Sequence, residues 1–150
     1  MQIVEKPEAR DVTMGEVRSQ VKLTNATDQS LVRRGQLTSD QVRAYTADAL
    51  VDTGAVRSVL PMHVVQQLGL AVVDRQVAEY ADGRQDVVGV TEALDFDIDG
   101  RRTLDEALVL GDEVIVGQTV LEKLDLLVDC VNRRVVPNPA HPDQPVSKVK

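Results

Sequence analysis

Apolar and polar residues alternate along several short runs of this chain, which is the pattern of β-strands that bury one face. In residues 94–98 the alternation is strict, because acidic residues separate Leu94, Phe96 and Ile98. Polar turn residues, glycine or proline bound each run. We expect strands at residues 17–23, 41–51, 56–60, 72–80, 85–90, 94–98, 104–110 and 126–128.

Two stretches follow the helical period instead. In residues 61–69 a proline begins the stretch, Met62, Val65 and Leu68 fall on one face, and a glycine ends it. Residues 118–124 predict a second short helix with three apolar positions: Val120, Leu121 and Leu124. The pattern as a whole predicts a mostly β protein with one or two short helices.

Asp-Gly pairs mark two hairpins. Asp82-Gly83 lies between the runs at 72–80 and 85–90, and Asp99-Gly100 follows the run at 94–98. Asp-Gly between two such runs is a strong hairpin signal, because tight hairpin turns need residues with positive φ. We therefore expect two β-hairpins.

The composition is that of one globular domain. Of the 150 residues 43% are hydrophobic but only 2% are aromatic, so the core has to be built from Val, Leu, Ile and Ala. We expect a flexible leader at residues 1–13, one domain at residues 14–137 and a proline-rich, disordered tail at residues 138–150.

Charge and cysteine content exclude several function classes. A net charge of -7 argues against nucleic-acid binding, which needs a basic face. Apolar runs are too short to span a membrane, and the single cysteine, Cys130, fits a reducing compartment, so we expect a cytoplasmic protein. His63 and His141 are far apart in the sequence, and with one cysteine they make no convincing metal site.

The most informative stretch for function is residues 49–55, Ala-Leu-Val-Asp-Thr-Gly-Ala, with Ser-Val-Leu-Pro following at 58–61. An apolar strand that ends on Asp52 brings a carboxylate to the edge of a core. Thr53 can donate a hydrogen bond, and Gly54 permits a sharp turn and the close approach of another backbone. The bare tripeptide is most often an ordinary turn after a strand.

The longer frame, Leu-Val-Asp-Thr-Gly-Ala and then Ser-Val-Leu-Pro, resembles the active-site segment of the retropepsin-like aspartic proteases. That single-domain family includes the retroviral proteases. Three further features follow in the family's order: a hairpin turn where the family carries its flap, the segment Ile115-Val116-Gly117, and a helix after it. The resemblance covers residues 14–137 and implies a closed β-rich acid-protease fold that forms a homodimer.

The chain contains one Asp-Thr-Gly, so the resemblance implies that each copy of a homodimer supplies one Asp52 carboxyl group. The two groups share a proton: the ionised one activates a water, and the protonated one donates to the peptide carbonyl oxygen. By the same resemblance, Thr53 of each copy would brace the turn of the other, and Gly54 would let the turns approach. The resemblance thus implies an aspartic endopeptidase that acts on peptides or unfolded proteins without a metal or cofactor.

The implied flap is the hairpin turn at residues 81–84, which would close over an extended peptide. Tyr80 and Arg84 flank the tip, and for these two an ordinary hairpin surface is an equally good interpretation. The substrate-binding residues that the resemblance implies are Ala55, Tyr80, Ala81, Asp82, Gly83 and Arg84.

Two features depart from the family's pattern. Retroviral members usually have a basic residue directly after the later glycine, where this chain has Gln118. Residues 24–43, with a possible helical turn at 29–34, are longer than the compact viral enzymes need. An alternative function is therefore a dimeric peptide-binding module of the same fold without catalysis.

Overall fold

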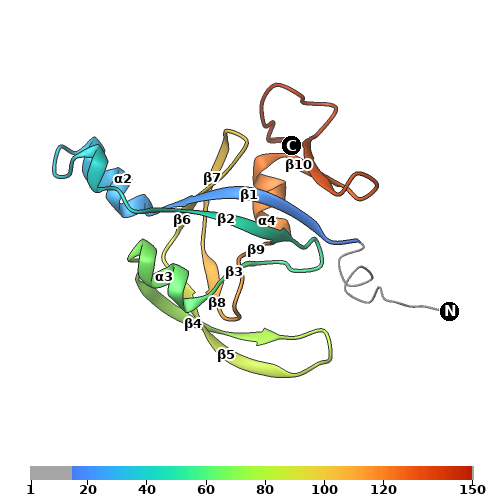
Figure 1. The fold of residues 1–150 in the computed structure, drawn as a ribbon, viewed down its shortest axis with the longest axis horizontal. Helices are drawn as coiled ribbons and strands as arrows, with labels where there is room; N and C mark the ends of the chain where they lie inside the picture. The colour runs from blue at the N-terminus through green and yellow to red at the C-terminus, as the bar shows by residue number, and fades with distance from the viewer. Residues whose placement is uncertain (1–14, 150) are drawn as a thin grey trace.

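The computed structural model describes residues 15–149, so the expected leader at residues 1–13 lies outside the described part. The strands are β1 (Val17–Thr24), β2 (Ala44–Val51), β3 (Ser58–Leu60), β4 (Val72–Glu79), β5 (Gln85–Thr91), β6 (Leu94–Ile98), β7 (Arg101–Asp105), β8 (Ala107–Val109), β9 (Ile115–Val116), β10 (Leu126–Asp129) and β11 (Arg134–Pro137). The helices are α2 (Ala26–Arg33), α3 (Met62–Leu68) and α4 (Gln118–Leu124), with a 3₁₀ turn, η1, at Ser39–Gln41 (Figure 1). The mostly β prediction is confirmed.

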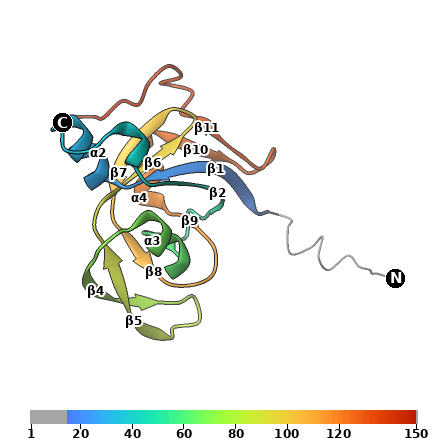
Figure 2. The same cartoon turned by 60° about the vertical axis from the view of Figure 1, so that its left-hand side comes forward.

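Nine strands form one sheet in the order β4-β5-β8-β3-β9-β2-β1-β6-β7, and β10 pairs with β11 in a small second sheet. The nine-stranded sheet ends in β4 on one side and in β7 on the other, so the predicted closure is wrong at the level of hydrogen bonding. The β4–β5 hairpin extends away from β1 and β2, as Figures 1 and 2 both show. Within residues 15–149 the edge strands β4 and β7 do not pair with each other.

The long antiparallel pair of β1 and β2 follows from the alternation in the sequence. Val17, Val21 and Leu23 are buried, and the residues between Val17 and Leu23 that face outward are mainly polar. In β2 the buried residues are Val51 and the small residues Ala47 and Ala49, which lie opposite Val21 and Ser19. Small residues on one strand leave room for larger side chains on its neighbours, which keeps the layer closely packed.

Aliphatic side chains form the core, as the composition requires. The single phenylalanine, Phe96, is completely buried. Around it the fully buried positions come from several strands and from the inner faces of α3 and α4: Leu23, Leu60, Leu68, Leu94, Ile98, Leu121 and Leu124. Phe96 on β6 pairs with Leu23 on β1, so the strictly alternating run at residues 94–98 lies at the centre of the fold.

The two helices predicted from periodicity are both present, with one change. For α4 the three predicted apolar positions are the buried ones. In α3 the buried residues are Val64, Val65 and Leu68, whereas Met62 is 49% exposed. Met62 is the first residue of the helix and projects beyond the core, so the buried face is made by Val64 in its place.

A third helix, α2, lies where the sequence suggested only a helical turn, so the described residues contain one more helix than predicted. Asn25 caps it, because its side-chain oxygen accepts from the N–H of Asp28 at 2.8 Å. The Asn25 amide also donates to the carbonyl of Leu68 at 2.8 Å, which fixes α2 against the end of α3. Tertiary contacts thus support a helix that propensity alone does not predict.

The predicted strand at residues 104–110 is divided between two partners. The turn at Asp99-Gly100 lets Arg101 pair directly with Ile98, so β7 begins earlier than predicted. After Asp105 the chain leaves β6, and β8 runs parallel to β3. Glu106 lies at this change of direction, which explains why acidic residues interrupt the apolar run.

The segment after β11 has no helix or strand up to residue 149, and hydrogen bonds attach it to the domain. The Asp125 carboxylate accepts from the Asn138 side chain at 3.0 Å and from the N–H of Val146 at 3.1 Å, and it lies 2.6 Å from Nδ1 of His141. These hydrogen bonds, that of Asn138 foremost, lower the pKa of Asp125. The guanidinium of buried Arg101 donates to the backbone carbonyl of His141 at 2.8 Å.

Across residues 15–149, none of the helices has the length and apolar character needed to cross a membrane.

An ion pair between buried Asp28 of α2 and exposed Arg43, which directly precedes β2, gives a testable pH dependence. The Asp28 carboxylate, almost fully buried, accepts from Nε and Nη2 of Arg43, both at 2.9 Å, and these bonds lower the pKa of Asp28. We expect Arg43→Met to reduce the free energy of unfolding by about 1–2 kcal/mol at pH 7, because the Asp28 carboxylate then keeps only the backbone N–H of residue 43 as a donor. Urea unfolding at a series of pH values measures this difference.

The sign follows from the lowered pKa. The contribution of the pair is fully present above the ordinary aspartate pKa, and it is lost as the pH falls through the lowered value. The difference between wild type and Arg43→Met therefore narrows on acidification. The exposed Arg34, at the end of α2, provides the control Arg34→Met, for which we expect a small difference at every pH. If the difference in unfolding free energy between wild type and Arg43→Met stays constant with pH, this interpretation is contradicted.

Candidate active site

The Asp-Thr-Gly turn begins directly after β2 and is held by its own backbone. The N–H of Asp52 donates to the carbonyl of Val116 at 3.0 Å, which continues the parallel pairing of β2 with β9. Within the turn, Oδ1 of Asp52 accepts from the N–H of Gly54 at 2.9 Å, and the Asp52 carbonyl accepts from the N–H of Ala55 at 3.1 Å. These bonds fix both the position and the orientation of the carboxylate.

A second loop, between β9 and α4, lies against the first. The N–H of Gln118 donates to the carbonyl of Ala55 at 2.8 Å, and that of Thr119 donates to the carbonyl of Val56 at 3.1 Å. The N–H of Gly117 donates to Oγ of Ser58 at 2.9 Å, in a completely buried contact. The first turn of α4 therefore binds the chain that leaves the Asp52 turn.

Gly117 is required by the closeness of the two loops. A Cβ atom on this residue would lie 2.6 Å from the backbone carbonyl of Arg57 and 2.9 Å from that of Ala55. Both obstacles are backbone atoms, so neither can move aside cheaply. Glycine at this position is explained by close backbone approach and not by an unusual φ.

Asp52, Thr53 and Gly54 are exposed in the single chain, and Ala55 is half-buried. The acid lies at the end of the apolar strand, as the sequence predicts, but beyond the core. Within residues 15–149 the hydrogen bonds of its carboxylate are those of Oδ1. Oδ2 and the Thr53 side chain are thus accessible to another molecule.

The hairpin tip is tightly organised. The N–H of Tyr80 donates to the Arg84 carbonyl at 2.8 Å, and Gly83 has the positive φ of 88° that the turn needs. Arg84 donates to Asp82 at 2.8 Å, and its guanidinium lies 4.8 Å from the centre of the Tyr80 ring. The backbone N–H and then the side chain of Arg84 lower the pKa of Asp82. Ala81, exposed like Asp82 and Gly83, completes the tip.

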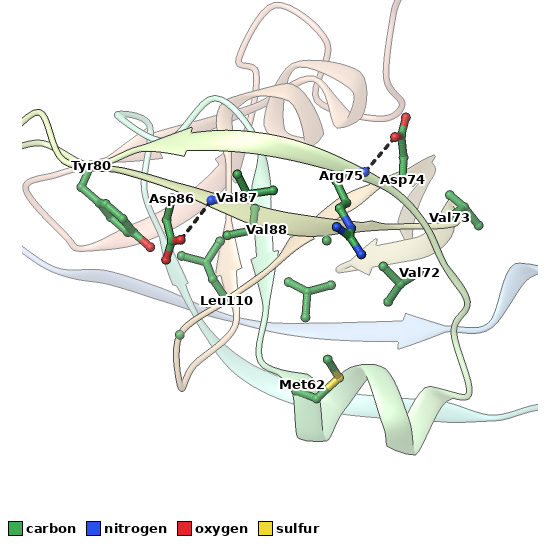
Figure 3. A pocket seen from close by; sticks show the side chains of 13 residues that line it. Met62, Val72, Val73, Asp74, Arg75, Tyr80, Asp86, Val87, Val88 and Leu110 are labelled. Carbon is green, nitrogen blue, oxygen red and sulfur yellow. Dashed lines mark hydrogen bonds between the residues drawn. The ribbon is translucent and has the colours of Figure 1, made fainter.

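A hollow of about 740 Å³ lies between the hairpin, the start of α3 and the loop after β8 (Figure 3). Arg75, Asp74 and Asp86 supply charge at its wall, and Tyr80 is the one predicted site residue that lines it. Apolar side chains line the rest of the hollow: Met62, Val72, Val73, Val87, Val88, Val109 and Leu110. Side chains of this kind can accommodate apolar groups of a ligand.

The predicted residues thus fall into two groups. Asp52, Thr53, Gly54 and Ala55 share one turn, and residues 80–84 share one hairpin tip. Within residues 15–149 no hydrogen bond or ion pair links these two groups. Asp52 does not line the hollow beside the hairpin. A single chain therefore contains both parts of the candidate site but does not join them.

Sequence reasoning missed two residues of the site. Ser58 is a buried polar residue in a strand-like run, which is a signal for an obligatory hydrogen-bond partner. Arg57 donates to Gln76 on β4 at 3.3 Å and to Glu106 at 3.1 Å, and so links the end of the Asp52 turn with the hairpin. Its place beside an apolar run gave no sign of this contact.

Comparison with known proteins supports the fold. The retroviral protease-like domain of Ddi1 from Leishmania major superposes with a TM-score of 0.51 at 18% sequence identity, over 82% of this chain and 90% of that domain. The EIAV protease in complex with the inhibitor HBY-793 gives a TM-score of 0.46 at 18% identity, over 71% of this chain and 86% of that protein. No protein-family model and no curated protein sequence matches the chain. The likeness to the Ddi1 domain confirms the retropepsin-like fold expected from the sequence.

The crowding at Gly117 predicts a large effect of a small change. We expect Gly117→Ala to lower the free energy of unfolding by about 2 kcal/mol, because the added methyl group collides with two backbone carbonyls. Urea unfolding followed by circular dichroism measures the change.

Gly54→Ala is the matched control. There the added Cβ would lie 3.2 Å from a side-chain atom, Oδ1 of Asp52, which can shift slightly. We expect this variant to stay close to wild type in stability. Equal losses for the two variants would show that close approach of the loops is not what requires Gly117.

Proposed function

We propose that this protein is a homodimeric aspartic endopeptidase. The observation that supports the proposal most directly is the Asp52 turn, in which backbone hydrogen bonds hold an exposed carboxylate between β2 and β9 of a retropepsin-like fold. A carboxylate held in this way is oriented before any substrate arrives, which is what acid–base catalysis requires. We further propose that residues 14–137 form the catalytic unit.

The turn offers one acid, and the reaction needs two. A two-fold axis beside the turn brings Asp52 close to Asp52 of a second copy, because a symmetric interface uses the same patch on both copies. The exposure of Thr53 and Gly54 supports this arrangement. In it the Thr53 hydroxyl braces the opposite turn, and Gly54 permits the two backbones to approach.

Two carboxylates at such a distance repel each other, so the assembled pair keeps one proton. The ionised group accepts a proton from a water molecule, whose oxygen attacks the peptide carbonyl carbon. The protonated group donates its proton to the carbonyl oxygen, and the tetrahedral intermediate then collapses with proton transfer to the leaving amine. In this mechanism residues of the chain carry every proton.

The hairpin and the hollow beside it suggest how a peptide is held. An extended segment between the Asp52 turn and the hairpin would be covered by the tip, with water excluded. The tip residues 80–84 and Ala55 are the substrate contacts that we propose. Tyr80 is the best supported of them, since it also lines the apolar hollow.

We propose a cytoplasmic location, which the single exposed cysteine, Cys130, supports. There an accessible thiol stays reduced. Peptides or unfolded proteins are the proposed substrates.

The acid itself gives the first test. We expect Asp52→Asn to reduce cleavage of an unfolded protein at mildly acid pH by about 10³-fold or more, since it removes the general acid–base group from both halves of the site. Asp48→Asn is the control, because Asp48 is another exposed acid four residues earlier on β2. Gel electrophoresis of the digested substrate measures both rates. Cleavage by Asp52→Asn at the wild-type rate would refute the proposal.

The shared site gives a second test. We expect about a tenfold excess of Asp52→Asn chains, mixed with wild type and left to exchange, to remove most of the wild-type activity, because wild-type chains are captured in mixed dimers. An equal excess of Asp48→Asn should cause no loss. If the activity per wild-type chain is unaffected by the inactive variant, each copy works alone.

A dimeric peptide-binding module without catalysis is the second candidate. Gln118, at the position where retroviral members usually have a basic residue, favours it, and its side chain is directed to Glu122 at 3.1 Å. Peptide binding by a stable dimer that cleaves nothing at any pH would select this function.

A further inference from the structure

The β4–β5 hairpin is attached to the sheet over a short stretch. β5 pairs with β8 through Gly89 and Val90, whereas the pairs nearer to the tip, from Gln76 with Val88 onward, join β4 and β5 to each other. β4 is the outermost strand of the sheet. A two-stranded arm of this kind is only marginally stable on its own.

Apolar packing fixes only part of this arm. Ala78, Val88 and Val90 are buried, but four valines of the hairpin strands are accessible, with exposed fractions from 48% to 62%: Val72, Val73, Val77 and Val87. Little apolar area therefore opposes movement of the arm relative to the sheet. Polar contacts to the body of the domain then have a larger share in fixing its position.

One such contact comes from Arg57. Its Nη1 donates to Oε1 of Gln76 on β4 at 3.3 Å, and its Nη2 donates to Oε1 of Glu106 at 3.1 Å. Arg57 directly precedes β3, which is separated from β4 by two strands in the sheet. One guanidinium thus bridges the outer strand of the hairpin and the junction between β7 and β8.

The backbone of Arg57 is fixed at the other end. It lies against Gly117, where no space is left for a Cβ atom. The neighbouring Val56 and Ser58 are hydrogen-bonded to the loop of Gly117, at 3.1 Å to Thr119 and at 2.9 Å to Gly117 itself. The guanidinium therefore projects from the most rigid part of the candidate active site.

We propose that Arg57 is a positioning residue that fixes the hairpin relative to the Asp52 turn. It connects the rigid pair of loops at Asp52 with the projecting arm through Gln76, and Glu106 holds the guanidinium in the bridging orientation. The consequence for catalysis rests on the proposed function. The effect on hairpin mobility does not.

Loss of this contact should change the kinetics of cleavage in a specific way. Without the bridge the arm occupies more open positions, so a smaller fraction of molecules is ready to bind a peptide. The apparent affinity falls by that fraction, whereas the chemistry of molecules that have closed is unchanged. Loss of Arg57 should therefore raise KM and leave kcat nearly as it was.

Amide hydrogen exchange tests the bridge without any substrate. We expect Arg57→Met and Gln76→Leu to increase exchange of the hairpin amides at residues 74–79 and 85–88 by about threefold or more, with the core strands β1 and β6 unchanged. Gln76 is exposed, so its variant keeps the test valid if Arg57→Met folds poorly. Lys123→Met is the control, because Lys123 pairs at 3.2 Å with Asp105, the residue next to Glu106, on the exposed side of α4. Hairpin exchange equal to wild type in Arg57→Met and Gln76→Leu would overturn the proposal.

Restoring the bridge with a second pair of side chains provides a further test. Arg57→Lys keeps the positive charge, but its single ammonium group replaces the two guanidinium nitrogens that form the bridge. We therefore expect a rate of hairpin amide exchange between those of wild type and Arg57→Met. Adding Gln76→Glu offers that ammonium a second carboxylate, and we expect the double variant to return toward wild type. If the hairpin amides of the double variant exchange as fast as those of Arg57→Lys alone, the result would count against the bridge.

For peptide cleavage we expect KM of Gln76→Leu to rise about fivefold with kcat changed less than about twofold, which a general loss of folded protein would not produce. A fall in kcat with KM unchanged would contradict the positioning role. If wild type cleaves nothing, the proposed function fails, and the exchange experiment still decides whether Arg57 holds the hairpin.

Discussion

The contact between two loops, one after β2 and one after β9, determines most of what this structure can do. Residues 52–58 and 116–119 come from distant parts of the chain and exchange backbone hydrogen bonds in both directions. β9 itself is only two residues long, so it would not be stable as a strand without neighbours on both sides. Burying the Ser58 hydroxyl without the Gly117 N–H would cost about 1–3 kcal/mol, which makes the two loops dependent on each other. The position of the Asp52 carboxylate is a consequence of this mutual support.

The rest of the domain divides into a rigid part and a projecting part around that contact. β1, β2, β6 and α4 enclose fully buried leucine, isoleucine and phenylalanine side chains, and packing of this density resists displacement. The hairpin has accessible valines and a short attachment to β8. This division suits a site in which the acid has to stay fixed while a cover moves over the substrate. It also assigns a purpose to polar contacts that would otherwise be ordinary surface interactions, such as that of Arg57 with Gln76.

Much of this fold could be predicted from the sequence because its signals are local. Strict alternation at residues 94–98, Asp-Gly at two turns and the apolar positions of α4 each depend on neighbouring residues, and the structure confirms them. The division of residues 101–109 between β7 and β8 was missed, since it depends on β3 offering a parallel partner that no local pattern reveals. Helix α2 was underestimated for the same reason, because its cap residue Asn25 is fixed by α3. For the candidate site, the Asp-Thr-Gly frame identified the turn. The requirement for glycine at position 117 and the contacts of Arg57 could not be predicted, because they depend on segments that are distant in the sequence and close in the fold.

A single chain of this protein presents its acid to solvent, and this has a consequence for how activity would arise. In a single chain the Asp52 carboxylate is exposed, and its Oδ1 accepts from the N–H of Gly54. Assembly would change its chemistry without any change in the turn, since the loops already hold the carboxylate in place. The repulsion between two ionised groups opposes that assembly, and uptake of one shared proton removes the repulsion. In the proposed dimer, assembly and proton binding would therefore be linked, and mildly acid conditions would favour both the assembled state and the singly protonated acid pair.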